Sequence, residues 1–532
     1  MLYTLNRLSF LFLFLTGFFS AIAQVDIGVE RRSPAKVKFE CARSTSRIEL
    51  DINKIRAMLH NGGDMWWTVT APSAARYEVP KQDDPSAPKR HSLFAGSVWV
   101  GGVDVSTDEL LVLASTYRQT SYSLWPGPLY ESGPDRGTIS SDECQTWDTH
   151  FKIDRETIEE YIDDFNAGFI QDIEDVPEPI LNWPGKNNPW ITSPNGVFSE
   201  SVVDMDRELA PFDEFIQIET EGSGDGIYNP LDGDVPFIYG DQGIWWVLND
   251  AGNEKEFGTI IGAAPPFRME IQVMGFGFAT NDVLNDMTFY WNRLLNRGTR
   301  ILAETRMGQW VDPALGFGFD DYVEVDVPRG LGMAYNGDEF DEGVGGYGDN
   351  PPSVGVDYFE GPWADKDTIG DGLDNDGDGA IDEPGRGYAV YEGDGIDNDK
   401  DGEIDELDEL IIMSNFAYYV NNSNNVNGNP SVARDFFNYL RNQWRDGTYC
   451  TYDVGNGTNQ NFPRCSFMFP GSSDLEIGWG LGGTPDQPFT GPANVPWDEN
   501  IAGNIPFDRR MLQSAGPFTL EPGALNELTI GI

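Results

Sequence analysis

Two aspartate-rich stretches carry the residue types and spacing of cation-binding loops. Residues 371–383 read DGLDNDGDGAIDE and residues 394–406 read DGIDNDKDGEIDE, so ten of thirteen positions are identical at an offset of 23. In the first loop Asp374, Asp376 and Asp378 occupy positions 1, 3 and 5, where carboxylate oxygens can converge on one ion. Gly379 follows at position 6, where such loops turn sharply. This pattern predicts a site for a hard divalent cation.

The candidate ligands of the two loops are the aspartates Asp371, Asp374, Asp376, Asp378, Asp382, Asp394, Asp397, Asp399, Asp401, Asp405 and Asp408. Calcium is preferred over magnesium because flexible, oxygen-rich loops suit its higher coordination number. Residues 365–409 hold 18 acidic and 3 basic side chains, a net charge of −15 that would be self-repulsive without cations. The alternative is a solvated acidic linker. An internal repeat that keeps glycine and isoleucine in register favours calcium.

The match to an EF-hand is incomplete. Position 12 is Gly385 in the first loop and Asp408 in the second, where a bidentate glutamate would be expected. Neither loop follows a segment with helical periodicity. The pattern instead resembles the aspartate repeats of thrombospondin type 3 and related extracellular calcium modules, in which neighbouring repeats share ions without flanking helices.

A looser third candidate contains Asp225, Asn229, Asp232 and Asp234, followed by Asp241. Its oxygens are spaced like those of a calcium loop. An Asx-rich double turn explains the same residues equally well, so both interpretations stay open.

The N-terminus predicts export. Arg7 provides a positive charge, residues 8–19 form an apolar stretch, and Ala21-Ile22-Ala23 matches a cleavage site, so residues 1–23 are predicted to be a signal peptide. The apolar stretch is shorter than the about 20 residues that a membrane-spanning helix needs. We expect a secreted or outer-membrane surface protein without a transmembrane segment.

Export favours disulfide bonds, because oxidising compartments preserve them. The chain has four cysteines. Cys450 and Cys465 enclose a loop rich in glycine and asparagine, which favours their pairing and leaves Cys41 with Cys144. Three connectivities are formally possible.

The composition restricts the function further. The 532 residues carry a formal charge of −52, which argues against nucleic acid and anionic membranes as partners. Aromatic residues make up 13% of the chain, too many for a disordered acidic protein. The length predicts two to four domains of about 100–200 residues each.

Frequent glycine, proline and short apolar runs predict a mainly β, multidomain protein with β-sandwich-like domains, small helical excursions and the calcium-loop insert. The expected domains are a signal peptide (1–23), an N-terminal mixed, mainly β domain (24–210), a β domain (211–361), the aspartate-rich insert (362–410) and a β-rich domain (411–532).

Local patterns predict several elements within these domains. Residues 92–104 suggest a strand, a Gly-Gly turn and a second strand, and residues 287–311 suggest a β-hairpin that turns at residues 297–298. Helical patches are expected at 52–59, 153–165 and 433–444. Alternation at residues 528–532 predicts a strand that is cut off at the end of the chain, as in the front part of a longer protein.

Over most of its mature length, the chain resembles large secreted proteins of Bacteroidota that are sorted by the type IX secretion system. The strings that carry this resemblance are residues 61–67 (NGGDMWW), 77–81, 92–104, 125–129, 225–234, 240–246 (GDQGIWW), 310–312, 320–321 and 514–520. The resemblance implies export and an interaction with the type IX machinery. The C-terminal sorting domain of that class is not found in this chain.

The favoured function is a calcium-binding structural or adhesion protein at the cell surface, with surface glycans or other surface proteins as partners. One alternative is a glycan-binding component that uses Trp66, Trp67, Trp245 and Trp246 as stacking platforms. A second alternative is an enzyme resembling glycoside hydrolases, which needs two suitably placed carboxylates. Because neither GxSxG nor HExxH occurs in the sequence, we expect no catalytic residue.

Overall fold

Antiparallel strands are the main regular structure of the described chain and far outnumber the helices, which confirms the predicted mainly β, sandwich-like class. The computed structural model describes residues 41–70, 73–117, 123–195, 215–217, 227–253, 266–362, 413–475 and 495–532. Residues Phe39–Ile532 belong to one compact unit. The two aspartate-rich loops lie outside the described residues.

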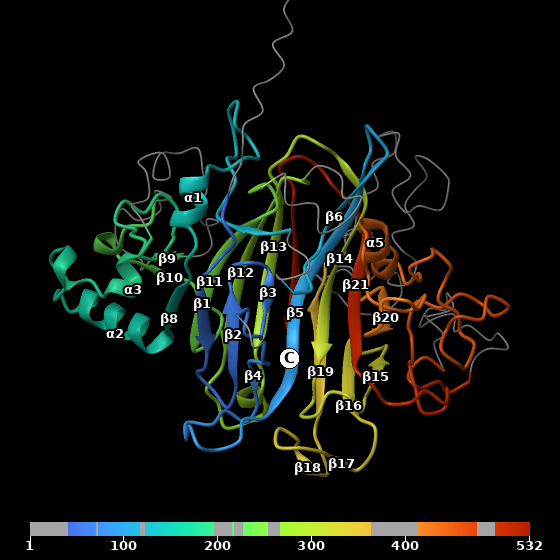
Figure 1. The fold of residues 1–532 in the computed structure, drawn as a ribbon. Helices are drawn as coiled ribbons and strands as arrows, with labels where there is room; N and C mark the ends of the chain where they lie inside the picture. The colour runs from blue at the N-terminus through green and yellow to red at the C-terminus, as the bar shows by residue number, and fades with distance from the viewer. Residues whose placement is uncertain are drawn as a thin grey trace, which may run out of the picture. The chain divides into compact units, whose positions relative to one another are not determined.

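Two large sheets, shown in Figure 1, organise this unit. The first sheet has the order β1 (Arg47–Leu50), β2 (Arg56–His60), β4 (Tyr77–Glu78), β5 (His91–Asp104), β14 (Leu302–Pro313), β21 (Arg509–Leu520) and β20 (Asn415–Val420), while β3 (Asp64–Met65) and β6 (Glu109–Leu113) also pair with β5. The second sheet has the order β15 (Asp321–Asp326), β16 (Leu331–Asn336), β19 (Ser353–Glu360), β22 (Leu525–Gly531), β13 (Phe289–Asn296), β12 (Met269–Gly277), β11 (Gln242–Asn249) and β7 (Trp125–Pro126), while β8 (Phe151–Asp154) also pairs with β11.

Smaller elements surround the sheets. Two-stranded ribbons join β9 (Phe215–Gln217) to β10 (Asp234–Pro236) and β17 (Phe340–Asp341) to β18 (Gly348–Asp349). The helices are α1 (Ser141–Thr146), α2 (Arg155–Asn166), α3 (Glu178–Leu181) and α5 (Ala433–Leu440), with 3-10 turns η1 (Ile173–Asp175), η3 (Pro230–Asp232) and η5 (Val283–Asp286).

The two sheets share one hydrophobic core. Trp66, which directly follows β3 of the first sheet, packs with Trp246 and Tyr290 of the second sheet. The Trp66 indole donates a hydrogen bond of 2.9 Å to the Tyr290 hydroxyl. Since successive residues of a strand point to opposite faces, Trp245 lies on the other side of β11, where it packs with Ile158 of α2. The second sheet is therefore buried on both faces in this region.

Helix α5 covers the outer face of the first sheet. Trp99 of β5 stacks on Trp310 of β14 with ring centroids 5.8 Å apart, and Phe436 of α5 meets Trp99 at 4.8 Å. Gly101 and Gly102 do not form the turn that their sequence suggests, because β5 runs straight through them. A Cβ at Gly101 would lie 2.5 Å from the ring of Phe437 on α5, so glycine allows this close packing.

The predicted hairpin at residues 287–311 is wrong in its pairing, although both strands exist. Strand β13 pairs with β12 and β22 in the second sheet, whereas β14 pairs with β5 and β21 in the first. The connection at residues 297–301 therefore crosses from one sheet to the other. Alternating apolar residues indicate a buried face, but they do not specify which strand lies beside it.

Two of the three predicted helical patches are helices in the structure, and the third is a strand. The patches at 153–165 and 433–444 contain α2 and α5, which confirms both. The patch at 52–59 is wrong, since Arg56–His60 is strand β2, paired with β1 and β4. The expected strand at residues 528–532 is confirmed as part of β22, which lies between β19 and β13.

Strands from the three predicted β regions are interleaved. The first sheet combines β5, β14 and β20, which come from residues 24–210, 211–361 and 411–532 respectively. The proposed boundaries at 210 and 361 thus divide the sequence without separating independent β bodies. Long-range antiparallel pairing brings distant segments into one sheet.

Candidate functional site

The loop between β14 and β15, residues 314–320, forms one wall of a pocket and ends at a cluster of carboxylates. At Gly316 φ is +65°, a conformation that side chains with a Cβ rarely adopt. A Cβ there would also overlap the carboxylate of Asp341. That carboxylate accepts hydrogen bonds from the backbone amides of Phe317 at 3.0 Å and Tyr347 at 2.7 Å. Asp341 thereby joins the loop to the β17–β18 ribbon.

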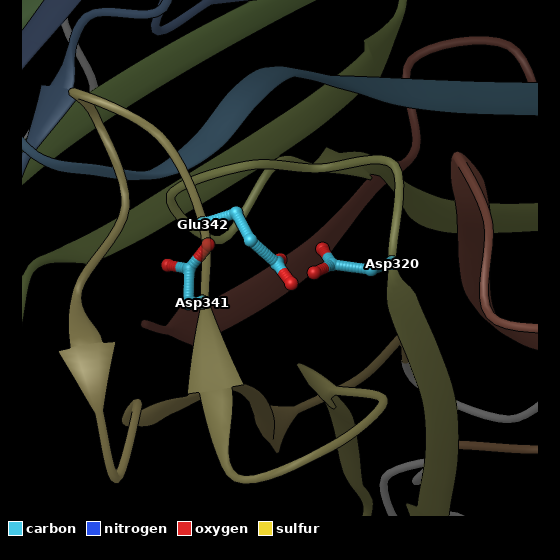
Figure 2. A group of neighbouring side chains, drawn as sticks. All are labelled: Asp320, Asp341 and Glu342. Carbon is cyan, nitrogen blue, oxygen red and sulfur yellow. The ribbon is translucent and has the colours of Figure 1, made fainter.

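Asp320, Asp341 and Glu342 form the carboxylate cluster. Each residue offers an oxygen atom, and these oxygens lie within 4.8 Å of one another. Figure 2 shows Asp320 at the start of β15, and Asp341 and Glu342 at the end of β17, with the Glu342 side chain reaching towards Asp320. Asp341 is buried, Asp320 is half-buried and Glu342 is exposed. The cluster is therefore open to solvent on one side.

The charges of this cluster disfavour one another. Burial raises the pKa of Asp320 to about 7, helped by a hydrogen bond with Glu342 and by the charges of Asp341 and Glu342. Without a cation, the Asp320 carboxyl thus keeps a proton up to near neutral pH. A bound cation would replace that proton, and oxygen ligands at this spacing suit calcium or magnesium.

Asp321, the next residue, adds a fourth carboxylate. It is fully buried, and one of its oxygens accepts a hydrogen bond of 3.1 Å from the Leu315 amide. Its Oδ1 atom has no hydrogen-bond partner among the described residues. Burial raises the pKa of Asp321 well above its ordinary value, and the charges of Asp320, Asp341 and Asp508 raise it further. The electrostatic interactions of the cluster therefore extend to Asp508.

Asp508 belongs to a pocket on the other side of the same loop. The pocket has a volume of about 360 Å³. That volume lies within the range of small-molecule sites. Its lining residues are Ala75, His91, Phe94, Tyr117, Asp312, Ala314, Gly316, Phe317, Gly318, Phe319, Asp508 and Arg510. Most of the lining is apolar, with four aromatic rings.

The polar residues of the pocket centre on Arg510. Its guanidinium is paired with Asp508 and lies 3.1 Å from Asp312, and it donates a hydrogen bond of 3.2 Å to the Tyr117 hydroxyl. The Tyr117 hydroxyl in turn donates to Asp312. Burial raises the pKa of Asp312 to about 8, with a contribution from Asp508, while Arg510 opposes the rise. These groups form a nearly dry polar network.

The calcium ligands predicted from the two aspartate repeats lie outside the described residues, as does Asp225. The other members of the third candidate do meet. The backbone N–H of Asn229 donates to the Asp234 carboxylate at 2.7 Å. The Asn229 side chain caps η3 and also donates to Asp232. These contacts are those of the Asx-rich turn that we considered as the alternative. Asp241 accepts from the backbone of Ala279 at 2.7 Å.

Of the two expected disulfides, one is formed. Cys41 and Cys144 are bonded, although their pairing was the less direct inference. The favoured pairing of Cys450 with Cys465 is wrong, because both residues are buried free thiols. The two residues lie opposite each other, with a backbone hydrogen bond of 3.0 Å, and the Cys465 sulfur contacts the Met468 sulfur at 3.7 Å. Apolar packing accommodates the reduced thiols there.

The tryptophans proposed as stacking platforms face the interior. Trp66, Trp67, Trp245 and Trp246 are each at most 2% exposed. The Trp-Trp pairs stabilise the two sheets, so they cannot present a flat ring to a sugar. This finding removes the sequence feature on which the glycan-binding alternative was based.

Sequence reasoning missed the cluster and the pocket. Asp320 and Asp321 stand out only as part of a family-like string, and Asp341 and Glu342 belong to no motif of the sequence. The only local signal is a pair of adjacent acids at each of two strand ends. About 20 residues separate the two pairs, with no repeat between them.

Comparison with protein-family models, with curated proteins and with solved structures returned no match. Within the described segments, no helix is long and apolar enough to cross a membrane.

Proposed function

We propose that this protein is an exported calcium-binding structural or adhesion protein of the cell surface, in which calcium acts as a structural ion. The observation that carries the proposal is the in-register aspartate repeat at residues 371–383 and 394–406. Its spacing suits oxygen coordination of calcium. The predicted signal peptide and the resemblance to type IX cargo support export.

The Asp320–Asp341–Glu342 cluster supports the same ion chemistry within the folded sheets. Its oxygens are close enough to share one cation. Burial and the neighbouring acids raise the pKa of Asp320 when no cation compensates their charge. A cation there would hold the β14–β15 loop against the β17–β18 ribbon. Calcium would thus stabilise the fold rather than take part in a reaction.

The test is calcium binding by the mature chain, measured by isothermal titration after chelator treatment. Saturating calcium should raise the unfolding free energy by about 2.7 kcal/mol per site when its concentration is a hundredfold above Kd. Removal by EDTA should lower the melting temperature and expose residues 365–409 to protease. If EDTA changes neither, the proposal is wrong.

Matched variants assign the response to the repeat. Replacing Asp374, Asp376 and Asp378 by asparagine should abolish binding by the first loop. A control with the same change in charge replaces Glu160 by glutamine and Asp163 and Asp164 by asparagine, on an exposed side of α2. This control should keep the calcium response of the wild type.

A further inference from the structure

The pocket beside the β14–β15 loop has the composition of a receptor for an organic cation. Aromatic rings reach it from three separate segments: Phe94 from β5, Tyr117 from the chain after β6, and Phe317 with Phe319 from the loop. Phe317 and Phe319 are 44% and 56% exposed, so their rings are available at the rim. The faces of aromatic rings attract cations through their quadrupoles.

Carboxyl groups outnumber permanent cations in the lining. Asp312 and Asp508 face one guanidinium, that of Arg510. His91 contributes no compensating charge near neutral pH, because burial lowers its pKa. Because the pKa of Asp312 is raised to about 8, this carboxyl holds a proton in the empty pocket near neutral pH, and an approaching cation favours its ionised form. An incoming cation is therefore favoured over a neutral or anionic ligand.

The hydrogen-bonding capacity of the pocket selects the kind of cation. The Arg510 guanidinium already donates to the Arg509 carbonyl at 2.9 Å as well as to Asp508 and Tyr117. Few donors are left for the hydroxyl groups of a sugar. A primary ammonium would need several acceptors to replace its water shell, whereas an alkylated ammonium is weakly hydrated and suits aromatic walls.

We propose that this pocket binds an alkylated ammonium group, with its methyl groups against Phe94, Tyr117, Phe317 and Phe319 and its charge facing Asp508 and Asp312. The volume of about 360 Å³ accommodates such a head group together with a short chain. The inference does not rest on the proposed function.

Isothermal titration with choline and with its neutral isostere 3,3-dimethyl-1-butanol tests the proposal on the full mature chain. The two probes have the same shape, so a difference in affinity reports the charge. Choline should bind saturably and at least about tenfold more tightly than the isostere. Glucose and ethanolamine serve as probes for a sugar site and a primary-ammonium site.

Ring variants test the position of the site. Replacing Phe317 and Phe319 by leucine keeps the rim apolar and should weaken choline binding by about tenfold. The control F169L changes a phenylalanine that is 68% exposed and lies outside the pocket lining. It should leave the affinity unchanged, and circular dichroism should show that each variant is folded.

The same head group can come from a free metabolite or from a methylated side chain on a polypeptide. Titration with a peptide that contains trimethyllysine separates the two sources. Tighter binding of choline than of the peptide indicates a free metabolite, and tighter binding of the peptide indicates a methylated side chain. The proposal is overturned if neither probe binds at about 10 mM. It is also overturned if the isostere, glucose or ethanolamine binds as well as choline, or if F169L weakens binding as much as the rim variants.

Discussion

Replacing Asp320 by asparagine should remove a pH-dependent penalty from the folded state. The pKa of this carboxyl rises from 3.8 to about 7 on folding. At about 1.4 kcal/mol per pKa unit, the full shift corresponds to about 4 kcal/mol. Because Asp320 is partly exposed, solvent screening reduces this to about 2 kcal/mol.

The sign follows from proton linkage. The folded state holds the proton more tightly than the unfolded state, so the unfolding free energy falls as pH rises from about 4 to about 7. Between pH 5 and pH 8 the wild type should lose about 1.5 kcal/mol more than D320N. For a unit of roughly 500 residues, the unfolding entropy converts this into about 1.5 °C.

Scanning calorimetry in EDTA at pH 5 and pH 8 measures this difference, since the other titrating groups are common to both proteins. The control D164N changes an exposed aspartate on α2 and should follow the wild type. Calcium at pH 8 should then raise the melting temperature of the wild type more than that of D320N. An unchanged pH slope in D320N would refute the raised pKa of Asp320, and an equal calcium response would exclude the cluster as a cation site.

Three further changes test the packing and covalent links of the fold. The variant G316A should lower stability by about 2 kcal/mol or more through overlap and backbone strain. The variant G343A, where φ is +85° and a Cβ would only make an ordinary contact of 4.0 Å with the Phe317 ring, should cost about 1 kcal/mol, and thermal unfolding compares the two. Replacing Cys41 and Cys144 by serine opens a covalent loop with a sequence separation of 103 and should cost about 4 kcal/mol in denaturant unfolding, while a reductant should have no further effect on the variant. The variant G101A should cost about 1–3 kcal/mol by displacing α5, and a normal unfolding free energy would contradict the close packing described.

The secondary structure could be predicted where the pattern is local. The helical spacing in residues 153–165 and the alternation in residues 528–532 correspond to α2 and β22. The turn predicted at the Gly-Gly pair in residues 92–104 is wrong, because two different kinds of position favour glycine. A turn needs its backbone freedom, and close packing against a helix needs its missing side chain.

Pairing between distant segments could not be predicted in the same way. Strands β13 and β14 follow each other closely and both have buried faces, which is also the pattern of a hairpin. Their actual neighbours include β21 and β22 from the end of the chain. Periodicity identifies the buried side of a strand, but the choice of neighbour depends on packing energies summed over the whole core.

The sequence alone determined the mainly β class, because strand patterns and turn residues act over a few positions. It also specified the aspartate repeat, whose spacing predicts a cation-binding loop. Only the tertiary structure decided the carboxylate cluster and the aromatic pocket. Asp320 meets Glu342, and Phe94 shares a pocket with Arg510, because two sheets bring separate loops to one place. Residues brought together by long-range pairing leave no spacing rule in the chain, so their chemistry is visible only after folding.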